Sequence, residues 1–393
     1  MPSGPIKSVI NIPFFGLKRQ YEAYREELLD ATDSVYRTGQ VLDGERTEAF
    51  ELQMAGRCHR EYALAVNSCS MGLFLALEAL NIRMSPIIMP TVSFPATLNA
   101  ALMGHNIPVY CDVDDHALID LETLPFSPKA NKINAMMYVN IFGNVVDYER
   151  MHVITDFFNN GEITVIEDAA QSFGAYYKDT PSGKLGDVSV LSFDPTKNLP
   201  NYGSGGMVLT DDWATYQSLK NLRDNGKDDA HTTYGTNTKM SEADCAQMLV
   251  KLKYFDKWQR RRTEIAEFYS DNLKEYVRVT QDNPNVTHAW HKYPIWLTDQ
   301  FYNQGPEAIP VRHRVKQMLY SAGIDTKIHY PTPLPELACN PHSSFMQTPN
   351  IYPVAEVHSR TELSLPIYPE LTDLEVEYIV ETVIDCISAE SVD

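Results

Sequence analysis

Short apolar runs alternate with amphipathic stretches through the first two-thirds of the chain. Tyr21, Tyr24, Leu28 and Val35 recur at spacings of three, four and seven, which predicts a helix. Later runs rich in Val, Ile and Met predict strands that are buried on both faces: 63–66, 86–89, 109–113, 135–139, 163–166 and 188–193. Helices are predicted over 71–80 and 94–103. This alternation indicates a layered α/β domain with a mainly parallel sheet.

The pattern changes near Ser241. From there the sequence predicts a long helical region to about Leu273. It then predicts a strand over 288–297, a helix over 311–322, a second strand over 326–330, a proline-rich loop and a last helix over 374–387. This order is typical of a smaller α+β unit. We therefore expect a large α/β domain over 1–245 and a small domain over 246–393.

Composition limits the classes of partner. The chain has 393 residues, 44% of them hydrophobic, and a formal net charge of −19, as expected of a globular protein with an acidic surface. Such a surface repels nucleic acid and anionic lipid, so an anionic small molecule would need a locally positive pocket. No apolar run is long enough for a membrane span. The six cysteines form no C-x-x-C pair, so we expect reduced, buried thiols in a cytoplasmic protein.

Two candidate chemical groups follow predicted strands. The run 163–166 ends in Glu167 and Asp168, and the run 188–193 leads to Lys197 ahead of a glycine-rich turn over 203–206. Ligands of parallel α/β sheets bind at the carboxyl ends of strands. A lysine and a carboxylate in one such pocket suit pyridoxal phosphate, where the lysine forms a Schiff base and the acid pairs with the pyridine nitrogen. Taken alone, the aspartate could be a helix cap and the lysine a surface charge.

Three further features fit the same cofactor. The segment 67–72, Asn-Ser-Cys-Ser-Met-Gly, follows a strand and opens a helix, where backbone amides could hold a phosphate, although a serine-rich cap looks similar. Phe94 could stack on the pyridine ring, or could be a core residue. Gln171, one helical turn after Asp168, could donate a hydrogen bond to the phenolic oxygen.

Together these motifs resemble the DegT/DnrJ/EryC1/StrS sugar aminotransferases, which are fold-type I pyridoxal-phosphate enzymes. The resemblance covers nearly the whole chain and rests on seven ordered segments: 38–44, 167–175, 192–199, 203–206, 234–241, 329–334 and 363–366. It implies a mainly parallel seven-stranded sheet between helices and a smaller C-terminal α+β domain.

The resemblance also implies roles for single residues. Lys197 would be the Schiff-base lysine and Asp168 the partner of the pyridinium, with Gln171 on the phenolic oxygen and Phe94 on the ring. The phosphate would be held by Ser68, Cys69, Ser70 and Ser192, and by Asn237 of the neighbouring subunit, because active sites of this family lie at a homodimer interface. Substrate contacts are predicted for His329, Tyr330 and Arg223, with Lys227 and Lys327 as further cationic candidates. Cys69, Ser204 and Lys239 stand where the family usually has Gly, an acid and Arg.

The implied reaction has two halves. An amino acid, expected to be L-glutamate, would leave its amino group on the cofactor as pyridoxamine 5′-phosphate, and this group would then pass to C3 or C4 of a nucleotide-linked ketosugar, as in amino-sugar and lipopolysaccharide O-antigen biosynthesis. Other readings stay open: a dehydratase-like or aminoshikimate-synthase-like enzyme, a desulfurase using Cys339, or a cofactor-binding regulator without catalysis. No metal site is expected, because the eleven histidines include no H-E-x-x-H spacing.

Overall fold

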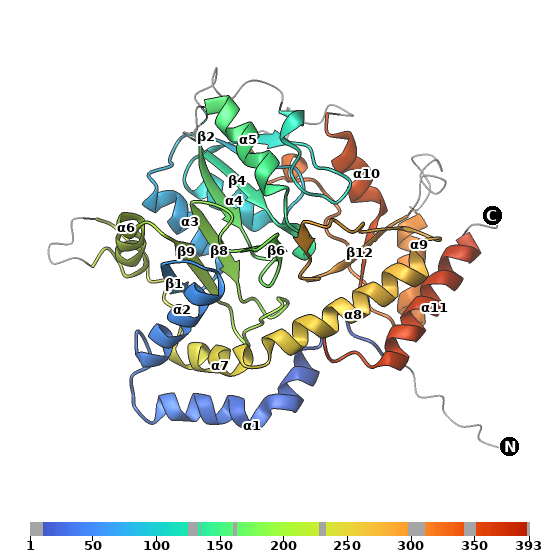
Figure 1. Ribbon diagram of the computed structural model, residues 1–393, viewed down its shortest axis with the longest axis horizontal. Coiled ribbons are helices and arrows are strands. Elements are labelled where there is room, and N and C mark those ends of the chain that lie inside the picture. The colour runs from blue at the N-terminus through green and yellow to red at the C-terminus, as the bar shows by residue number, and fades with distance from the viewer. Residues whose placement is uncertain are drawn as a thin grey trace.

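A seven-stranded sheet forms the centre of the larger part of the molecule in the computed structural model, which describes residues 11–124, 133, 135–159, 163–227, 233–297, 311–341 and 351–390 (Figure 1). Its strands are β1 (Tyr62–Val66), β2 (Pro86–Pro90), β3 (Ile107–Cys111), β4 (Ala135–Val139), β5 (Thr164–Asp168), β8 (Val188–Ser192) and β9 (Gly206–Thr210), in the order β1-β9-β8-β5-β4-β2-β3. Only β9 runs antiparallel to its neighbours. The predicted strands and the mainly parallel seven-stranded sheet are confirmed, whereas β9 was not predicted beyond its glycine-rich start.

Helices cover both faces of this sheet, which explains why its strands are apolar on both sides. One face packs against α3 (Cys69–Ala79), α4 (Pro95–Met103) and α6 (Trp213–Arg223). The other packs against α2 (Glu45–Arg57), α7 (Glu242–Leu252), the start of α8 (Phe255–Leu273) and, at its far end, α5 (Tyr148–Asn159). The predicted N-terminal helix is α1 (Leu17–Tyr36), which lies on α7.

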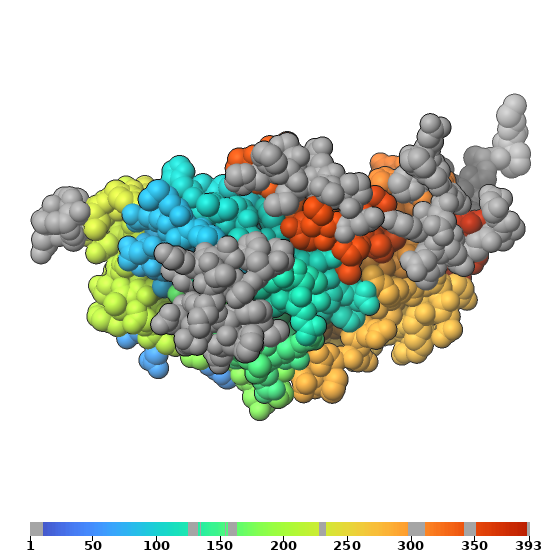
Figure 2. All heavy atoms as spheres, turned by 90° about the horizontal axis from the view of Figure 1, so that it is seen from above, coloured from blue at the N-terminus to red at the C-terminus, as the bar shows by residue number. Residues whose placement is uncertain are grey.

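The C-terminal third builds a second core around a small antiparallel sheet. Its strands are β10 (Arg278–Val279), β12 (Tyr293–Trp296) and β13 (Glu362–Leu365), and its helices are the distal part of α8, α9 (Val311–Ser321), α10 (Pro353–Thr361) and α11 (Asp373–Glu390). Ile12, from before α1, is buried in this core as well. Viewed from above, these gold, orange and red segments occupy one side and the blue to green segments the other (Figure 2). A third small sheet joins β6 (Tyr176–Tyr177), β7 (Thr180–Pro181) and β11 (Val286–Thr287).

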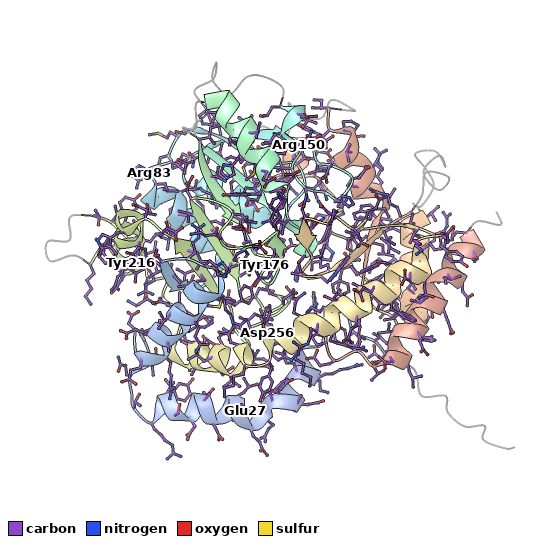
Figure 3. All side chains as sticks on the ribbon, in the orientation of Figure 1. Glu27, Arg83, Arg150, Tyr176, Tyr216 and Asp256 are labelled. Atoms are coloured by element: carbon purple, nitrogen blue, oxygen red, sulfur yellow. The ribbon has the colours of Figure 1, made fainter. Side chains whose placement is uncertain are left out.

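The long helical region predicted from Ser241 is two helices, α7 and α8, separated at Lys253 and Tyr254. No glycine or proline marks this break in the sequence. The junction is tied to α1 through Glu27, which is labelled on that helix in Figure 3. Glu27 accepts a hydrogen bond from the Tyr254 hydroxyl and pairs with Lys253 at 3.3 Å. Residue 245, the predicted domain boundary, falls inside α7, which packs on α1 and α2 of the large unit.

Two predicted C-terminal strands differ from the structure. Only Tyr293–Trp296 of the run 288–297 is a strand, because the preceding residues pair with a turn: the Ala289 N–H donates to the Gly143 carbonyl at 2.7 Å. The run 326–330 is not a strand but forms a single bridge from Lys327 to Ser364. There the His329 N–H donates to the Glu362 carboxylate at 2.5 Å instead of to a strand carbonyl.

Two further expectations concern the state of the cysteines and the presence of membrane-spanning helices. All six cysteines are free thiols; five are buried, and Cys339 is exposed. Within the described ranges, no helix combines the length and the apolar character needed to cross a bilayer.

Glu167 holds the centre of the sheet together. Its buried carboxylate accepts hydrogen bonds from Asn140 Nδ2 (2.8 Å), Ser182 Oγ (2.7 Å), Ser189 Oγ (2.6 Å) and the Leu185 N–H (3.0 Å). These donors lie on three separate segments, so one carboxylate joins β5 to the loops beside it. A buried charge is tolerated only when it is saturated with donors in this way.

We predict that Glu167→Ala lowers the free energy of unfolding by about 3 kcal/mol or more, because it leaves several buried donors unsatisfied. Denaturant unfolding of the two variants Glu167→Ala and Glu149→Ala checks this. Glu149 makes an exposed ion pair with Lys178, so its loss should cost less than about 1 kcal/mol. Equal destabilisation by the two substitutions would contradict the role given to Glu167.

Candidate active site

A cavity of ≈ 400 Å³ opens at the carboxyl ends of β5 and β8 and at the N-terminus of α3. Residues of the C-terminal unit close its other side. The structure brings most of the predicted site residues together here: Ser68, Cys69, Ser70, Phe94, Asp168, Gln171, Ser192, Lys197, His329 and Tyr330 all line it, as do Lys327 and Ser204.

Asp168 is the last residue of β5, and its side chain is buried. Its Oδ2 accepts a hydrogen bond from Thr97 Oγ1 at 2.8 Å, and its Oδ1 accepts one from the Ala170 N–H at 3.1 Å. Thr97 is in turn fixed by Ser93, whose hydroxyl lies 2.8 Å away. Burial raises the pKa of Asp168, although both donors and the nearby Lys197 act to lower it. The carboxylate thus lines the cavity, and no described residue forms an ion pair with it.

Lys197 lies in a tight turn after β8. The Asp194 side chain accepts hydrogen bonds from the Thr196 N–H (2.9 Å) and hydroxyl (2.6 Å), and the Lys197 N–H donates to the Asp194 carbonyl (2.9 Å). Asn198 anchors the turn by donating to the Ala289 carbonyl at 2.7 Å. The Lys197 amine has neither a hydrogen bond nor an ion pair in the described part of the chain. Burial lowers the pKa of this amine, against the opposing effect of nearby acidic groups.

The N-terminus of α3 forms a cradle for an anion. Ser68 caps the helix, its Oγ accepting from the Met71 N–H at 3.3 Å, and Ser192 faces the same space from β8. Gly206 allows β9 to approach this turn, since a Cβ there would lie 2.7 Å from the Cys69 nitrogen. Cys69 itself begins the helix without a positive φ, so it replaces glycine without backbone strain. Burial raises the pKa of its thiol, which lies 3.9 Å from Asp168 Oδ1.

Aromatic and amide groups surround the mouth of the cavity. Phe94 caps α4 and is 56% exposed, with its ring centroid 6.0 Å from that of Tyr330, so its face is available for stacking rather than packed in the core. Gln171 Oε1 accepts from the Phe142 N–H at 3.0 Å, which directs Nε2 toward the Tyr330 hydroxyl at 3.2 Å. An amide nitrogen carries two protons, so Gln171 can donate a second hydrogen bond to a ligand.

Other predicted residues lie outside the cavity. Arg223 is buried against Glu51 (3.2 Å), Asp43 (3.0 Å) and the Ala65 carbonyl (3.0 Å). Its charge is already compensated there, so the predicted substrate contact is not supported for the site in this chain. Asn237 is exposed and bridges to Asp224, away from the cavity. Lys227 is exposed and outside it too. Lys239, in the usual arginine position, pairs with Asp224.

Sequence reasoning missed several groups at the site. Thr97, which orients Asp168, appears in the sequence only as a polar residue in an apolar helix. Lys292 lines the cavity and directly precedes the apolar strand β12, a contrast that could have identified it. The His329 ring is held by Ser364, whose Oγ lies 2.9 Å from His329 Nδ1 and donates to Glu362 at 2.5 Å.

The sequence of the chain also matches a known protein family. The model of the DegT/DnrJ/EryC1/StrS aminotransferase family matches residues 22–384. The chain belongs to this aminotransferase family. The predicted family, fold and enzyme class are therefore confirmed.

Individual relatives of the family align over almost the whole chain. The erythromycin biosynthesis sensory transduction protein EryC1 of Saccharopolyspora erythraea is 29% identical, with 95% of this chain and 99% of that protein covered. The dTDP-3-amino-3,4,6-trideoxy-α-D-glucose transaminase of Streptomyces venezuelae is 30% identical, with 95% of each covered. The solved structure of S. venezuelae DesV with a ketimine intermediate has a TM-score of 0.86 at 29% identity, covering 96% of this chain and 98% of that one.

We predict that the Lys197 amine reacts with aldehydes at a lower pH than exposed lysines do. Only the unprotonated amine attacks an aldehyde, and burial lets Lys197 lose its proton at lower pH. Reductive methylation of the cofactor-free protein across a pH series, followed by peptide mass spectrometry, gives the onset of labelling for each lysine. Lys18, with a side chain 89% exposed, is the reference. If the two lysines label in parallel as pH rises, Lys197 is not the activated amine described above.

Proposed function

We propose that this aminotransferase works with pyridoxal 5′-phosphate held on Lys197 and aminates a keto carbon, C3 or C4, of a nucleotide-linked sugar, with L-glutamate as the amino donor. One observation carries the proposal: the Lys197 amine, which no described residue pairs with, and the buried Asp168 carboxylate open into the same cavity. Each group is costly to bury alone, and each gains a partner when a pyridine aldehyde binds between them.

The groups around the cavity suit each part of that cofactor. Asp168 can accept a hydrogen bond from the protonated pyridine nitrogen, and Gln171 Nε2 can donate to the phenolic oxygen. Phe94 offers an exposed ring face for stacking. The N-terminal amides of α3, with Ser70 and Ser192, can hold the phosphate, as helix N-termini commonly do.

Bound pyridoxal phosphate withdraws electrons from the bonds at the substrate Cα and so makes loss of a proton there possible. Lys197 supplies the base, because burial lowers the pKa of its amine and so favours the unprotonated form. The same amine can return a proton to the adjacent carbon, so one residue serves as base and then as acid. Asp168, which lines the same cavity, would accept a hydrogen bond from the protonated ring nitrogen and so favour that form.

The acceptor class is supported by the substrates named for relatives. Among proteins 28–30% identical to this chain are transaminases of dTDP-linked sugars and a 3-aminotransferase of a UDP-linked sugar. A GDP-perosamine synthase is 28% identical. These names share a sugar joined to a nucleoside diphosphate, while the base and the sugar vary. The common feature is therefore the class we propose for this chain.

We predict that Lys197→Ala abolishes amino transfer, lowering the turnover rate by at least about 1,000-fold, because it removes both the attachment point and the base. Product formation from glutamate and a panel of nucleotide-linked ketosugars measures this. Lys253→Ala, which removes an exposed lysine on the α7–α8 junction, is the control and should keep wild-type turnover. A Lys197→Ala variant as active as wild type would overturn the proposal.

The similarity to a protein named for sensory transduction makes a non-catalytic regulator the rival function. That function requires no amine at position 197 that can exchange with substrate. Wild-type protein that binds pyridoxal phosphate but never transfers its amino group, with any acceptor in the panel, would favour the regulator.

We further propose that the active site is completed by a second copy of the chain, whose Asn237 reaches the phosphate. Asn237 is exposed and lies outside its own cavity, as such a role requires. In mixtures of Lys197→Ala and Asn237→Ala subunits, each mixed dimer would contain one site with both defects and one intact site. Random mixing should then restore about a quarter of wild-type activity. A mixture no more active than its two components would contradict shared sites.

A further inference from the structure

Lys292 is a buried lysine that the proposed reaction has not used so far. It precedes β12, it is 5% exposed, and it lines the cavity that contains Lys197 and Asp168. In the part of the chain that the structure describes, its amine has no hydrogen bond and no carboxylate partner. A buried ammonium without an anion is costly, so its presence at a ligand cavity points to an anionic ligand group.

The position of Lys292 is fixed rather than incidental. Its N–H donates to the Phe142 carbonyl at 3.2 Å. Gly143 permits this approach, since a Cβ on it would lie 2.7 Å from the His291 nitrogen. On the other side, Asn198 donates to the Ala289 carbonyl at 2.7 Å. The backbone that carries Lys292 is therefore tied directly to the turn that carries Lys197.

Two aromatic rings hold the amine where an anion could reach it. The Lys292 Nζ lies 5.5 Å from the Phe14 ring centroid and 5.3 Å from that of Phe15. Ring faces attract an ammonium without neutralising it, so its capacity to donate hydrogen bonds is unused. Phe15 also lines the cavity, which places the amine at the wall rather than behind it.

The other basic groups opposite Lys197 are less suited to bind an anion. Lys327 already pairs with Asp325 at 3.4 Å. His329 is held through Nδ1 by Ser364, and burial lowers the pKa of its ring well below the usual value, which disfavours the charged form. Burial likewise lowers the pKa of Lys292, and Lys197 adds to this effect. An anion beside Lys292 would favour its protonated form, so ligand binding and protonation would support each other.

We propose that Lys292 binds a carboxylate of the amino donor and thereby orients the donor's amine toward Lys197. The inference rests on the proposed function, since every amino-acid donor carries a carboxylate into this cavity. A protein with a net charge of −19 repels such a donor over most of its surface, so a local cation is needed to hold it. The alternative source of an anion is an acidic group on the sugar acceptor.

The test compares the two half-reactions of the cofactor-loaded enzyme in wild type, Lys292→Met and Lys292→Arg. Methionine keeps the length of the side chain and removes the charge. We expect Lys292→Met to raise the glutamate concentration needed for half-maximal cofactor conversion roughly 10- to 100-fold, as for loss of a charged hydrogen bond, and to leave the ketosugar half-reaction within about twofold. Lys292→Arg should retain most of the glutamate affinity.

Binding without reaction gives an independent readout. Glutarate, a dicarboxylate without an amine, should raise the Tm of the wild-type cofactor-loaded protein, and should raise that of Lys292→Met much less. Without ligand, Lys292→Met should melt at or above the wild-type temperature, because it removes a buried amine that has no hydrogen-bond partner in the described part of the chain. Lys253→Met is the matched control for loss of an exposed lysine and should behave as wild type in every assay.

The outcomes separate this inference from the function on which it rests. If wild type does not respond to glutamate, both fail. If wild type responds and Lys292→Met has the same glutamate dependence, only the role of Lys292 is overturned. If the variant loses only the ketosugar half-reaction, the anion belongs to the acceptor, and the donor assignment is likewise overturned.

Discussion

The burial of opposite charges around one cavity is the constraint on which the site depends. Asp168 ends a central strand with its carboxylate out of water, and Lys197 presents an amine with no partner in the described structure. Both pKa values are shifted by burial toward the neutral form. A protonated pyridine ring joined to the lysine would relieve the cost at the carboxylate. Cofactor binding would thus give each of these two buried groups a partner.

The fold keeps these groups in place with hydrogen bonds that are themselves buried. Glu167, next to Asp168 in β5, joins the strand to the segments around it, while Thr97 orients the Asp168 carboxylate from α4. The turn with Lys197 is anchored to residue 289, just ahead of β12. The segment that leads into β12 is therefore joined to the Lys197 turn by a side-chain-to-backbone hydrogen bond. This rigidity suits a reaction in which one amine must move protons between fixed carbons.

Much of the arrangement could be predicted because it follows from local patterns. Apolar runs located β1 to β5 and β8, and the order of Asp168, Gln171 and Lys197 after strands located the site. Contacts made by distant partners could not be predicted. The segment 326–330 has strand-like residues, but Glu362 takes the His329 N–H. Arg223 likewise pairs with Asp43 and Glu51, which are distant from it in the sequence. The sequence around Lys292 shows only a charged residue ahead of an apolar strand. That Lys292 lines the same cavity as Lys197 depends on the tertiary fold.

The most direct measurement is identification of the lysine that holds the cofactor. Borohydride reduction of the protein loaded with pyridoxal phosphate makes the bond permanent, and peptide mass spectrometry then locates the added group. The account predicts a reduced phosphopyridoxyl group on Lys197, with labelling strongly diminished by Asp168→Asn. A cofactor fixed to Lys292, Lys327 or a surface lysine, or no label on any lysine, would contradict it.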